Sequence, residues 1–197
     1  AFPSAEPFTY NFVVPEGSEI DDYYEAASGV GTPTGIVNRT MYKNLYNVNP
    51  SEWSQAIDAQ LELTAPVMID LQAGYNEQER EINLNAELTF MLDSDNLSYA
   101  AYILEDGIVK PQKDREAPVE NVLDYVHNDV LRGSFRGTWG EEIPDMPADK
   151  DEIREISWDY LVPEDSDWVL ENVKFVAIVF DTDTREIVQV ELVKLFE

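Results

Sequence analysis

The sequence predicts a mainly β protein, in which an antiparallel, immunoglobulin-like β-sandwich follows a mixed α/β segment. Two observations carry this prediction. Apolar residues recur at helical spacing before Pro66 and at every second position after it. Seven such alternating or apolar runs, separated by polar or Pro-containing turns, then fill about 130 residues, which is typical of a sandwich. We therefore divide the chain into a first segment, 1–64, and a sandwich domain, 65–197.

The first segment combines turns and helices with little strand pattern. We expect extended backbone over 8–14, a short helix over 18–27 capped by Ser18, and a short apolar strand at Ile36 and Val37. Asn49, followed by Pro and then Glu, forms a strong helix start. The helix predicted over 49–63 should bury one face, formed by Trp53, Ala56, Ile57 and Leu61.

The sandwich domain opens with two alternating runs, 67–75 and 82–92, joined by a polar hairpin loop over 75–79. Because strand side chains alternate between the two faces of a sheet, each run should bury one face and expose the other. The run 173–180 is apolar on both sides, so we expect a central strand there. Further strands are predicted at 97–105, 130–138, 153–161 and 187–196.

The composition excludes several classes of function. The chain has 40 Asp and Glu against 13 Lys and Arg, a net charge of −27, which repels nucleic acid and anionic lipid. With no Cys and with His127 as the only His, disulfides, thiolate catalysis and multi-His metal sites are excluded. No apolar run is long enough for a transmembrane helix. Since the chain starts at Ala1 and not at Met, we interpret it as a mature or truncated product.

Several segments carry a family resemblance. Residues 125–133, Tyr-Val-His-Asn-Asp-Val-Leu-Arg-Gly, and 137–141, Gly-Thr-Trp-Gly-Glu, resemble the Omp-twenty-eight-related outer-membrane lipoprotein family of Bacteroidetes. Residues 168–173 and 187–189 are similar too. The resemblance implies a lipid-anchored protein of the outer membrane or cell surface, in which a thioredoxin-like domain with a Cys-x-x-Cys pair precedes a β-sandwich.

The resemblance extends into the first segment, which would be a partial thioredoxin-like segment. Residues 31–39 resemble the cis-proline loop of such a domain, with Pro33 as the cis proline. Two departures matter. The Cys pair is absent, which removes redox activity from this chain, and Asp129 replaces the second His of the family's His-Asn-His run. The second departure weakens the case for a His-pair metal site.

Acidic clusters are the first candidate sites. Asp-x-Asp runs occur at 93–95, 165–167 and 181–183, and closely spaced carboxylates are the ligands that calcium prefers. None of the runs has the Gly and the distal Glu of a complete calcium loop. We interpret them as turns whose Asp side chains bind backbone amides. No metal or cofactor is expected. The adjacent Glu141 and Glu142 should point to opposite sides, unlike a glycosidase pair.

The remaining candidates are single residues. His127 could act as a general base with Asp124 or Asp129, but no nucleophile motif accompanies it, so a hydrogen-bonded structural role is favoured. Arg132 and Arg136 should pair with carboxylates in so acidic a chain. Exposed Trp rings could stack on a sugar, although core positions are the more common place for them. The Trp residues considered are Trp139, Trp158 and Trp168.

Two hypotheses about function follow. In the first, the chain is a noncatalytic cell-surface module that binds a protein or glycan, with Pro33, His127, Arg132 and Trp139 as structural residues. In the second, it is the distal part of a thiol-disulfide oxidoreductase whose Cys-x-x-Cys lies upstream of Ala1. The first hypothesis is preferred, because no residue pattern in this chain supplies catalytic groups.

Overall fold

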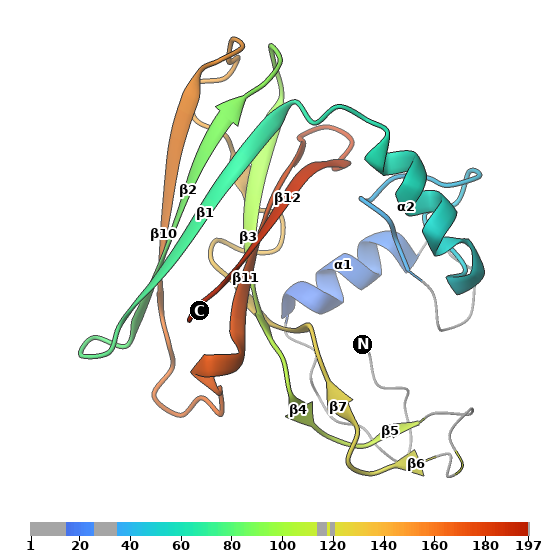
Figure 1. Cartoon of the computed structure of the whole chain (residues 1–197), viewed down its shortest axis with the longest axis vertical. Coiled ribbons are helices and arrows are strands. Elements are labelled where there is room, and N and C mark those ends of the chain that lie inside the picture. Colours follow the sequence, from blue (N-terminus) through green and yellow to red (C-terminus); the bar gives the residue numbers. More distant parts are fainter. Residues whose placement is uncertain (1–14, 26–34, 114–117, 119–120, 197) are drawn as a thin grey trace.

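The structure is a computed structural model that describes residues 15–25, 35–113, 118 and 121–196. Two antiparallel sheets pack face to face, and two helices lie beside the larger sheet (Figure 1). The predicted class, a mainly β antiparallel sandwich, is therefore confirmed. Its immunoglobulin-like topology stays a prediction.

The smaller sheet has three strands in the order β1-β2-β10. These are β1 (Val67–Asn76), β2 (Glu81–Phe90) and β10 (Ile153–Leu161). The alternation in the sequence is seen directly in the burial, since Val67 and Ile69 are buried while Met68 and Asp70 are exposed. Because this period is a local property of the strand, the predicted runs match the observed strands closely.

The larger sheet has the order β12-β11-β3-β8. Its strands are β3 (Leu97–Glu105), β8 (Val130–Ser134), β11 (Val173–Asp181) and β12 (Ile187–Lys194), and the short β9 (Glu141–Glu142) also pairs with β3. Strand β11 lies inside the sheet, as its two apolar faces predict. Strand β8 ends before the predicted Thr138, because the chain turns at Gly137, which has a φ of +85°.

The core lies between the two sheets. Phe90 and Phe175 are fully buried there, and Trp158 packs against Tyr99 with ring centroids 5.5 Å apart. Each such aromatic side chain removes a large apolar area from water, which is the main term that stabilises the sandwich.

The outer face of the larger sheet has an apolar cluster of its own, formed by Ala100, Tyr102, Ile178 and Phe180. Helix α1 (Pro15–Glu25) contacts β8 on this sheet. The Glu16 carboxylate accepts hydrogen bonds from the backbone N–H and the hydroxyl of Ser134, at 3.1 and 2.8 Å. The first segment therefore packs on the sandwich.

A narrow extension continues beyond β3 and consists of two-residue strands (Figure 1). Strand β4 (Ile108–Val109) pairs with β7 (Val126–His127), and β5 (Gln112–Lys113) pairs with β6 (Asn121–Val122). The sequence did not predict these strands, because two residues are too few to show a period.

Three expectations for the first segment are wrong. Instead of a strand at Ile36 and Val37, the chain enters a turn in which Asn38 and Arg39 have φ of +48° and +56° and the Thr40 N–H donates to Val37 O. Helix α1 begins at Pro15, so Ser18 is inside the helix and is not its cap. Proline suits the first helical turn because it has no N–H to satisfy.

The third correction concerns the amphipathic helix predicted over 49–63. A 3-10 turn, η1 (Pro50–Glu52), leads into α2 (Trp53–Leu61), in which only Ala56 is buried. Trp53, Ile57 and Leu61 are exposed. No sheet covers this face of α2 in the described part of the chain, so spacing alone identified the helix but not its burial.

The thioredoxin-like segment is not confirmed. Between residues 15 and 64 the described ranges contain helices and isolated bridges, such as Gly35–Val48, and no sheet strand. The extended stretch 8–14 and Pro33 lie outside the described residues. The X-Pro bond that is cis within those residues is Met146–Pro147. The boundary between 1–64 and 65–197 stays a prediction.

Candidate functional site

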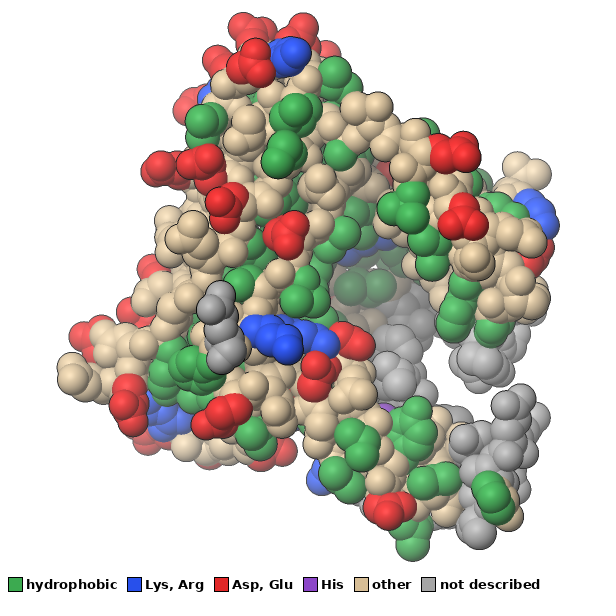
Figure 2. Space-filling view, viewed as in Figure 1, with side chains coloured by type: hydrophobic (Ala, Val, Ile, Leu, Met, Phe, Trp, Pro, Cys, Tyr) green, Lys and Arg blue, Asp and Glu red, His purple; other side chains and the backbone are tan. Residues whose placement is uncertain are grey.

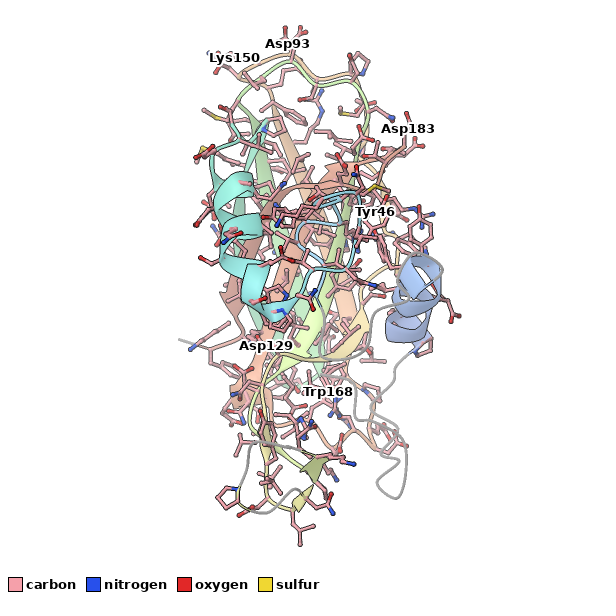
Figure 3. The ribbon with its side chains drawn as sticks, turned by 90° about the vertical axis from the view of Figure 1, so that its right-hand side faces the viewer. Tyr46, Asp93, Asp129, Lys150, Trp168 and Asp183 are labelled. Atoms are coloured by element: carbon pink, nitrogen blue, oxygen red, sulfur yellow. The ribbon has the colours of Figure 1, made fainter. Side chains whose placement is uncertain are left out.

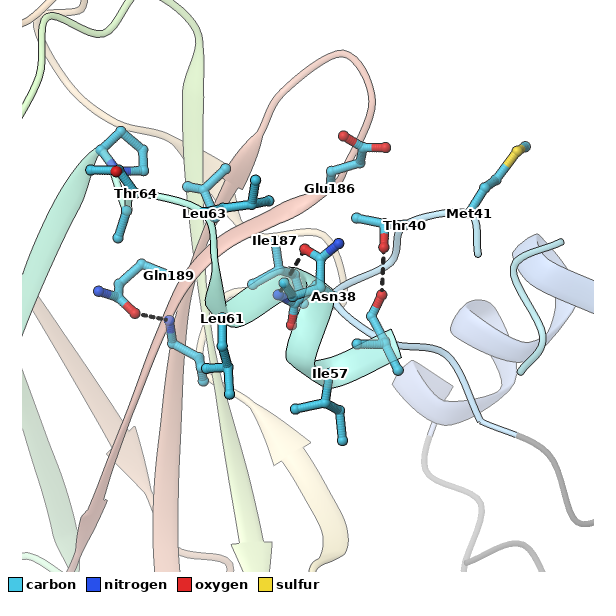
Figure 4. A pocket seen from close by; sticks show the side chains of 16 residues that line it. Asn38, Thr40, Met41, Ile57, Leu61, Leu63, Thr64, Glu186, Ile187 and Gln189 are labelled. Carbon is cyan, nitrogen blue, oxygen red and sulfur yellow. Dashed lines mark hydrogen bonds between the residues drawn. The ribbon is translucent and has the colours of Figure 1, made fainter. Parts of the chain in front are cut away.

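An apolar cleft of about 570 Å³ lies between α2 and the first half of β12 (Figure 2). One wall comes from α2 and the residues after it, and the other comes from β12. In Figure 4, Ile57 and Leu61 project from α2, while Ile187 and Gln189 lie on β12. The residues that form the walls are mostly apolar, and they include Val37, Met41, Leu63 and Val190.

The helical wall is apolar because Ile57 and Leu61 stand one turn apart on α2 and therefore share a face. Leu61 is 77% exposed, and Leu63, just past the helix end, is 66% exposed. Side chains this apolar rarely stay this exposed side by side on a soluble surface unless the surface binds something. The wall is thus an apolar surface that the described residues leave uncovered.

Hydrogen bonds from both side chains and backbone hold the two walls in place. Asn38 Nδ2 donates to Gln60 Oε1 on α2 at 3.2 Å, and the Ile187 N–H donates to Asn38 O at 2.8 Å. On the other side, Gln189 Nε2 donates to Val67 O at 3.1 Å and ties β12 to β1. The turn at Asn38 is therefore the link between α2 and the sheet.

The chemistry of the cleft is that of a binding surface. Among the described lining residues, Glu186 is the carboxylate and there is no His. The amide side chains at Asn38, Gln60 and Gln189 already have partners. Apolar contact, together with a polar rim, is what the cleft offers to a ligand.

His127 lies on β7, outside the cleft lining. Its side chain is buried, its Nε2 lies 3.2 Å from Lys110 O, and its ring meets the ring of Tyr125 edge-on at 4.8 Å. These contacts fit a structural residue. The carboxylate of Asp129 instead faces Lys174.

Arg132 and Arg136 contact carboxylates. Arg132 forms ion pairs with Asp167 and with Glu105, the latter at 3.3 Å, and its guanidinium lies 5.6 Å from the centre of Trp168. The hydrogen bond from Arg132 holds the pKa of Asp167 below its usual value. Arg136 lies 3.7 Å from Glu141.

The Glu141 and Glu142 pair does not form a cleft of facing carboxyls. The two residues are adjacent on β9, and Glu141 Oε2 accepts a hydrogen bond from the Tyr99 hydroxyl at 3.0 Å. Burial is the main cause that raises the pKa of Tyr99, and the hydrogen bond to Glu141 raises it further. These contacts are those of a short strand, β9, paired with β3.

Each of the three candidate Trp rings is already in contact with other side chains. Trp158 is buried in the core, and Trp168 stacks on Tyr160 with centroids 5.7 Å apart and an interplanar angle of 16°. Trp139 is flanked by Arg39 and Arg185. A sugar ring would have to displace one of these neighbours in order to stack.

In the Asp-x-Asp runs, Asp93 and Asp181 accept hydrogen bonds from backbone amides, whereas Asp167 pairs with Arg132. Asp93 accepts a hydrogen bond from the Lys150 N–H at 2.9 Å, at the upper end of the molecule in Figure 3 and far from Trp168. Asp181 Oδ1 accepts the N–H groups of Asp183 and Thr184, at 3.0 and 2.8 Å. Within the described ranges, no three His, Asp or Glu side chains are grouped to share a metal ion.

Sequence reasoning missed the cleft and the residues around Trp139. Leu63 and Val190 carry no motif, and Arg39 and Arg185 are ordinary basic residues in loops. The available signal was the apolar face of the 49–63 helix, for which the first segment supplies no strand pattern. Which element would lie opposite that face was not visible in the sequence.

Comparisons with known proteins identify the family. The family model described as "Outer membrane protein Omp28" matches residues 19–197. Among solved structures, the chain is similar to a domain of the outer membrane lipoprotein Omp28 from Porphyromonas gingivalis, with 24% identity and a TM-score of 0.47. That match covers 68% of this chain and 91% of the other.

A weaker similarity is to a Niemann-Pick type C2 protein from Japanese carpenter ant, with 14% identity, a TM-score of 0.36, and coverage of 62% of this chain and 85% of that one. No curated protein matches the sequence. None of the described helices is long and apolar enough to cross a bilayer. Because the family model matches most of the length of this chain, the chain belongs to the Omp28 family of outer membrane proteins.

Proposed function

We propose that this outer membrane protein is a noncatalytic binding module of the cell surface, and that it binds a protein partner in the cleft between α2 and β12. The observation that carries the proposal is the exposed apolar wall formed by Ile57, Leu61 and Leu63 opposite Val190. A row of aliphatic side chains beside a sheet edge suits the apolar anchors of a peptide segment.

The negative charge around the cleft indicates which kind of peptide segment would bind there. Glu186 lines the cleft, and the exposed Glu62 and Glu191 each adjoin a lining residue in the chain. These carboxylates, together with the net charge of −27 on the whole chain, favour a partner whose apolar anchors are flanked by Lys or Arg. Complementary charge should also speed association, and salt should weaken this effect.

A glycan partner has less support. Sugar recognition relies on open aromatic faces, and Trp139 and Trp168 are both covered by neighbouring side chains. The cleft itself is lined by aliphatic and not by aromatic side chains. A protein segment therefore suits the cleft better than a saccharide does.

The test uses a random 12-residue peptide library displayed on phage and selected on the immobilised full chain. We expect the enriched peptides to carry aliphatic anchors with Lys or Arg beside them. Their affinity, measured by fluorescence polarisation, should fall about tenfold or more in Leu61→Glu, because a carboxylate would stand in the apolar wall. The matched control is Leu161→Glu on β10, at a residue 68% exposed outside the cleft lining.

Two outcomes would contradict the proposal. One is a set of enriched peptides that bind wild type and Leu61→Glu equally. The other is the absence of any enriched peptide together with saturable binding on a glycan array.

A further inference from the structure

Two turns from distant parts of the chain lie side by side above the outer face of the larger sheet. The first, residues 37–40, and the second, the β11–β12 hairpin loop, are joined by the hydrogen bond from the Ile187 N–H to Asn38 O. Each turn holds an arginine in the left-handed region, Arg39 at φ +56° and Arg185 at φ +63°. Non-glycine residues in this region cost free energy and are concentrated at functional sites.

Both arginines converge on one indole ring. The Arg185 Cζ atom lies 3.9 Å from the ring centre of Trp139, and the Arg39 Cζ atom lies 5.3 Å from it. Tyr23 on α1 packs against the same ring at 5.1 Å, and Arg185 lies 4.3 Å from Tyr23. Two guanidiniums thus share one aromatic cluster.

Arg39 is buried, and no described carboxylate forms an ion pair with it. It is 7% exposed, and its Nη2 donates to the Tyr102 hydroxyl at 2.9 Å, which in turn donates to Thr138 O at 2.6 Å. Its Nη1 is also out of contact with water and has no hydrogen-bond partner in the part of the chain that the structure describes. A buried guanidinium N–H without an acceptor is costly, and a bound ion or an ordered water that accepts from it removes that cost.

No carboxylate among the described side chains forms an ion pair with Arg39 or Arg185. Within the described ranges, the ion pairs involve Lys43, Arg132, Arg136, Arg154 and Lys174, and neither Arg39 nor Arg185 is among them. The Glu16 carboxylate on α1 accepts its hydrogen bonds from Ser134. In a chain with 40 acidic residues, two neighbouring cations without an acidic partner among the described side chains are unexpected.

A second donor without an acceptor belongs to the same cluster. The Tyr24 hydroxyl is buried and has no hydrogen-bond partner among the described residues. Burial raises the pKa of Tyr24 to about 12, although the nearby Arg39 acts in the opposite direction. At neutral pH this hydroxyl is therefore a protonated donor, as the guanidinium is.

We propose that the cluster of Arg39, Tyr24, Arg185 and Trp139 is a binding site for a carboxylate group. The carboxylate accepts from Arg39 Nη1 and the Tyr24 hydroxyl, and Arg185, which is half-buried, moves off Trp139 to admit it and then pairs with it. A single negative charge is favoured over a phosphate dianion, because the field of a chain at −27 opposes each added negative charge.

The site is independent of the cleft and of the function proposed for it. Asn38 and Thr40 line the cleft, whereas Arg39, between them, contacts Tyr102 and the Trp139 ring on the sheet. A ligand can therefore occupy one site without touching the other.

The test is an NMR titration of the ¹⁵N-labelled full chain with sodium acetate, at ionic strength held constant with sodium chloride. The chain has four Trp indoles, and the Trp139→Phe spectrum identifies the one that belongs to the site. We expect the Trp139 indole signal to move saturably with acetate while the other three stay in place. A blocked peptide with one Glu side chain and a peptide with a free C-terminus, as two further titrants, separate the sources of the carboxylate.

Variants make the assignment specific. Arg185→Gln should weaken acetate binding about tenfold, and Tyr24→Phe should weaken it about threefold, since each removes one donor to the anion. The control is Arg154→Gln, at an arginine that pairs with Glu152 elsewhere, and it should bind acetate as wild type does. The proposal is overturned by a Trp139 signal that does not saturate, by an equal response in Arg185→Gln, or by a response to inorganic phosphate and not to acetate.

Discussion

The Lys174 ammonium lies 2.7 Å from each carboxylate oxygen of Asp106, at the point where β11 meets the end of β3. Asp129 approaches the same ammonium at 2.5 Å, and its backbone N–H donates to Asp106 at 2.7 Å. The Lys174 side chain is largely buried. One buried ammonium therefore joins the larger sheet to the turn before β8.

The first prediction is a pH dependence of this contact. Burial opposes the shift, but the hydrogen bond from Lys174 lowers the pKa of Asp106. Stability from a carboxylate with a lowered pKa is present above its usual pKa of about 3.9 and is lost as the pH falls through the folded value. Lys174→Met should lower the free energy of unfolding at neutral pH by on the order of 1 kcal/mol, a modest figure because Asp106 is partly exposed.

Urea denaturation across a pH series checks this. The difference between Lys174→Met and wild type should begin to shrink near pH 4, where Asp106 of the unfolded chain binds its proton, and should shrink further as the pH falls through the lowered pKa of folded Asp106. Lys150→Met, at an exposed lysine, is the control and should show no such trend. A difference that stays constant at acidic pH would show that Lys174 acts through packing alone.

The second prediction compares two glycines. Gly140 has a φ of +61°, and a Cβ there would lie 1.8 Å from the carbonyl oxygen of Tyr99. Gly137 has a φ of +85°, with nothing within 4 Å of such a Cβ. Gly137→Ala should cost about 1 kcal/mol from backbone strain alone, whereas Gly140→Ala should cost more than about 3 kcal/mol.

Chemical denaturation of the two glycine variants gives the answer. Gly74→Ala, in a strand and with open space around the added methyl, provides a baseline for the substitution itself. Equal losses for Gly137→Ala and Gly140→Ala would mean that β3 and β9 can separate at little cost.

The third prediction concerns two buried tyrosines. The Tyr24 hydroxyl has no partner among the described residues, so Tyr24→Phe should leave stability unchanged or raise it by up to about 1 kcal/mol. The Tyr102 hydroxyl bonds both Arg39 and Thr138, so Tyr102→Phe should cost about 1 to 3 kcal/mol. The pair should be compared in chloride buffer, without carboxylates.

Tyr24 also predicts how the stability of the protein changes at alkaline pH. Burial raises the pKa of Tyr24 to about 12. Unfolded tyrosine loses its proton near pH 10, so the stability held by neutral Tyr24 is complete below that pH and declines as the pH rises toward 12. Thermal melts between these pH values should show a smaller loss for Tyr24→Phe than for wild type. Parallel losses would place Tyr24 in contact with water.

The fourth prediction concerns the division of the chain. Residues 65–197 should fold alone, because both sheets and the core between them lie in this part. Their melting temperature should be lower than that of the full chain, since removal of the first segment uncovers Tyr102 and Phe180. Residues 1–64 should not fold alone, because a piece this short rarely holds a core without disulfides and it has no Cys.

Circular dichroism melts of the two pieces test this division. A cooperative transition from 1–64, or none from 65–197, would show that the boundary is elsewhere. Mixing the two pieces should restore part of the lost melting temperature, because the first segment packs on the outer face of the larger sheet.

The sandwich could be predicted from the sequence because strand alternation is local. The period of two in runs such as 82–92 and 153–161 predicts which face is buried, and the structure buries that face along β2 and β10, although Leu92, past the end of β2, is exposed. The doubly apolar run 173–180 likewise determined its place inside a sheet. In the first segment the helix around Trp53 was visible for the same reason, through its period of 3.6.

What the tertiary structure alone decided is which surfaces meet. The apolar face of α2 was expected to be buried, but whether a helix face is covered depends on the element opposite it, and β12 leaves a cleft there. Arg39, Trp139 and Arg185 are far apart in the chain and share no motif, so nothing local brings them together. They meet because the turn at residues 37–40 docks on the β11–β12 hairpin, a contact whose energy comes from packing between distant segments and therefore leaves no period in the sequence.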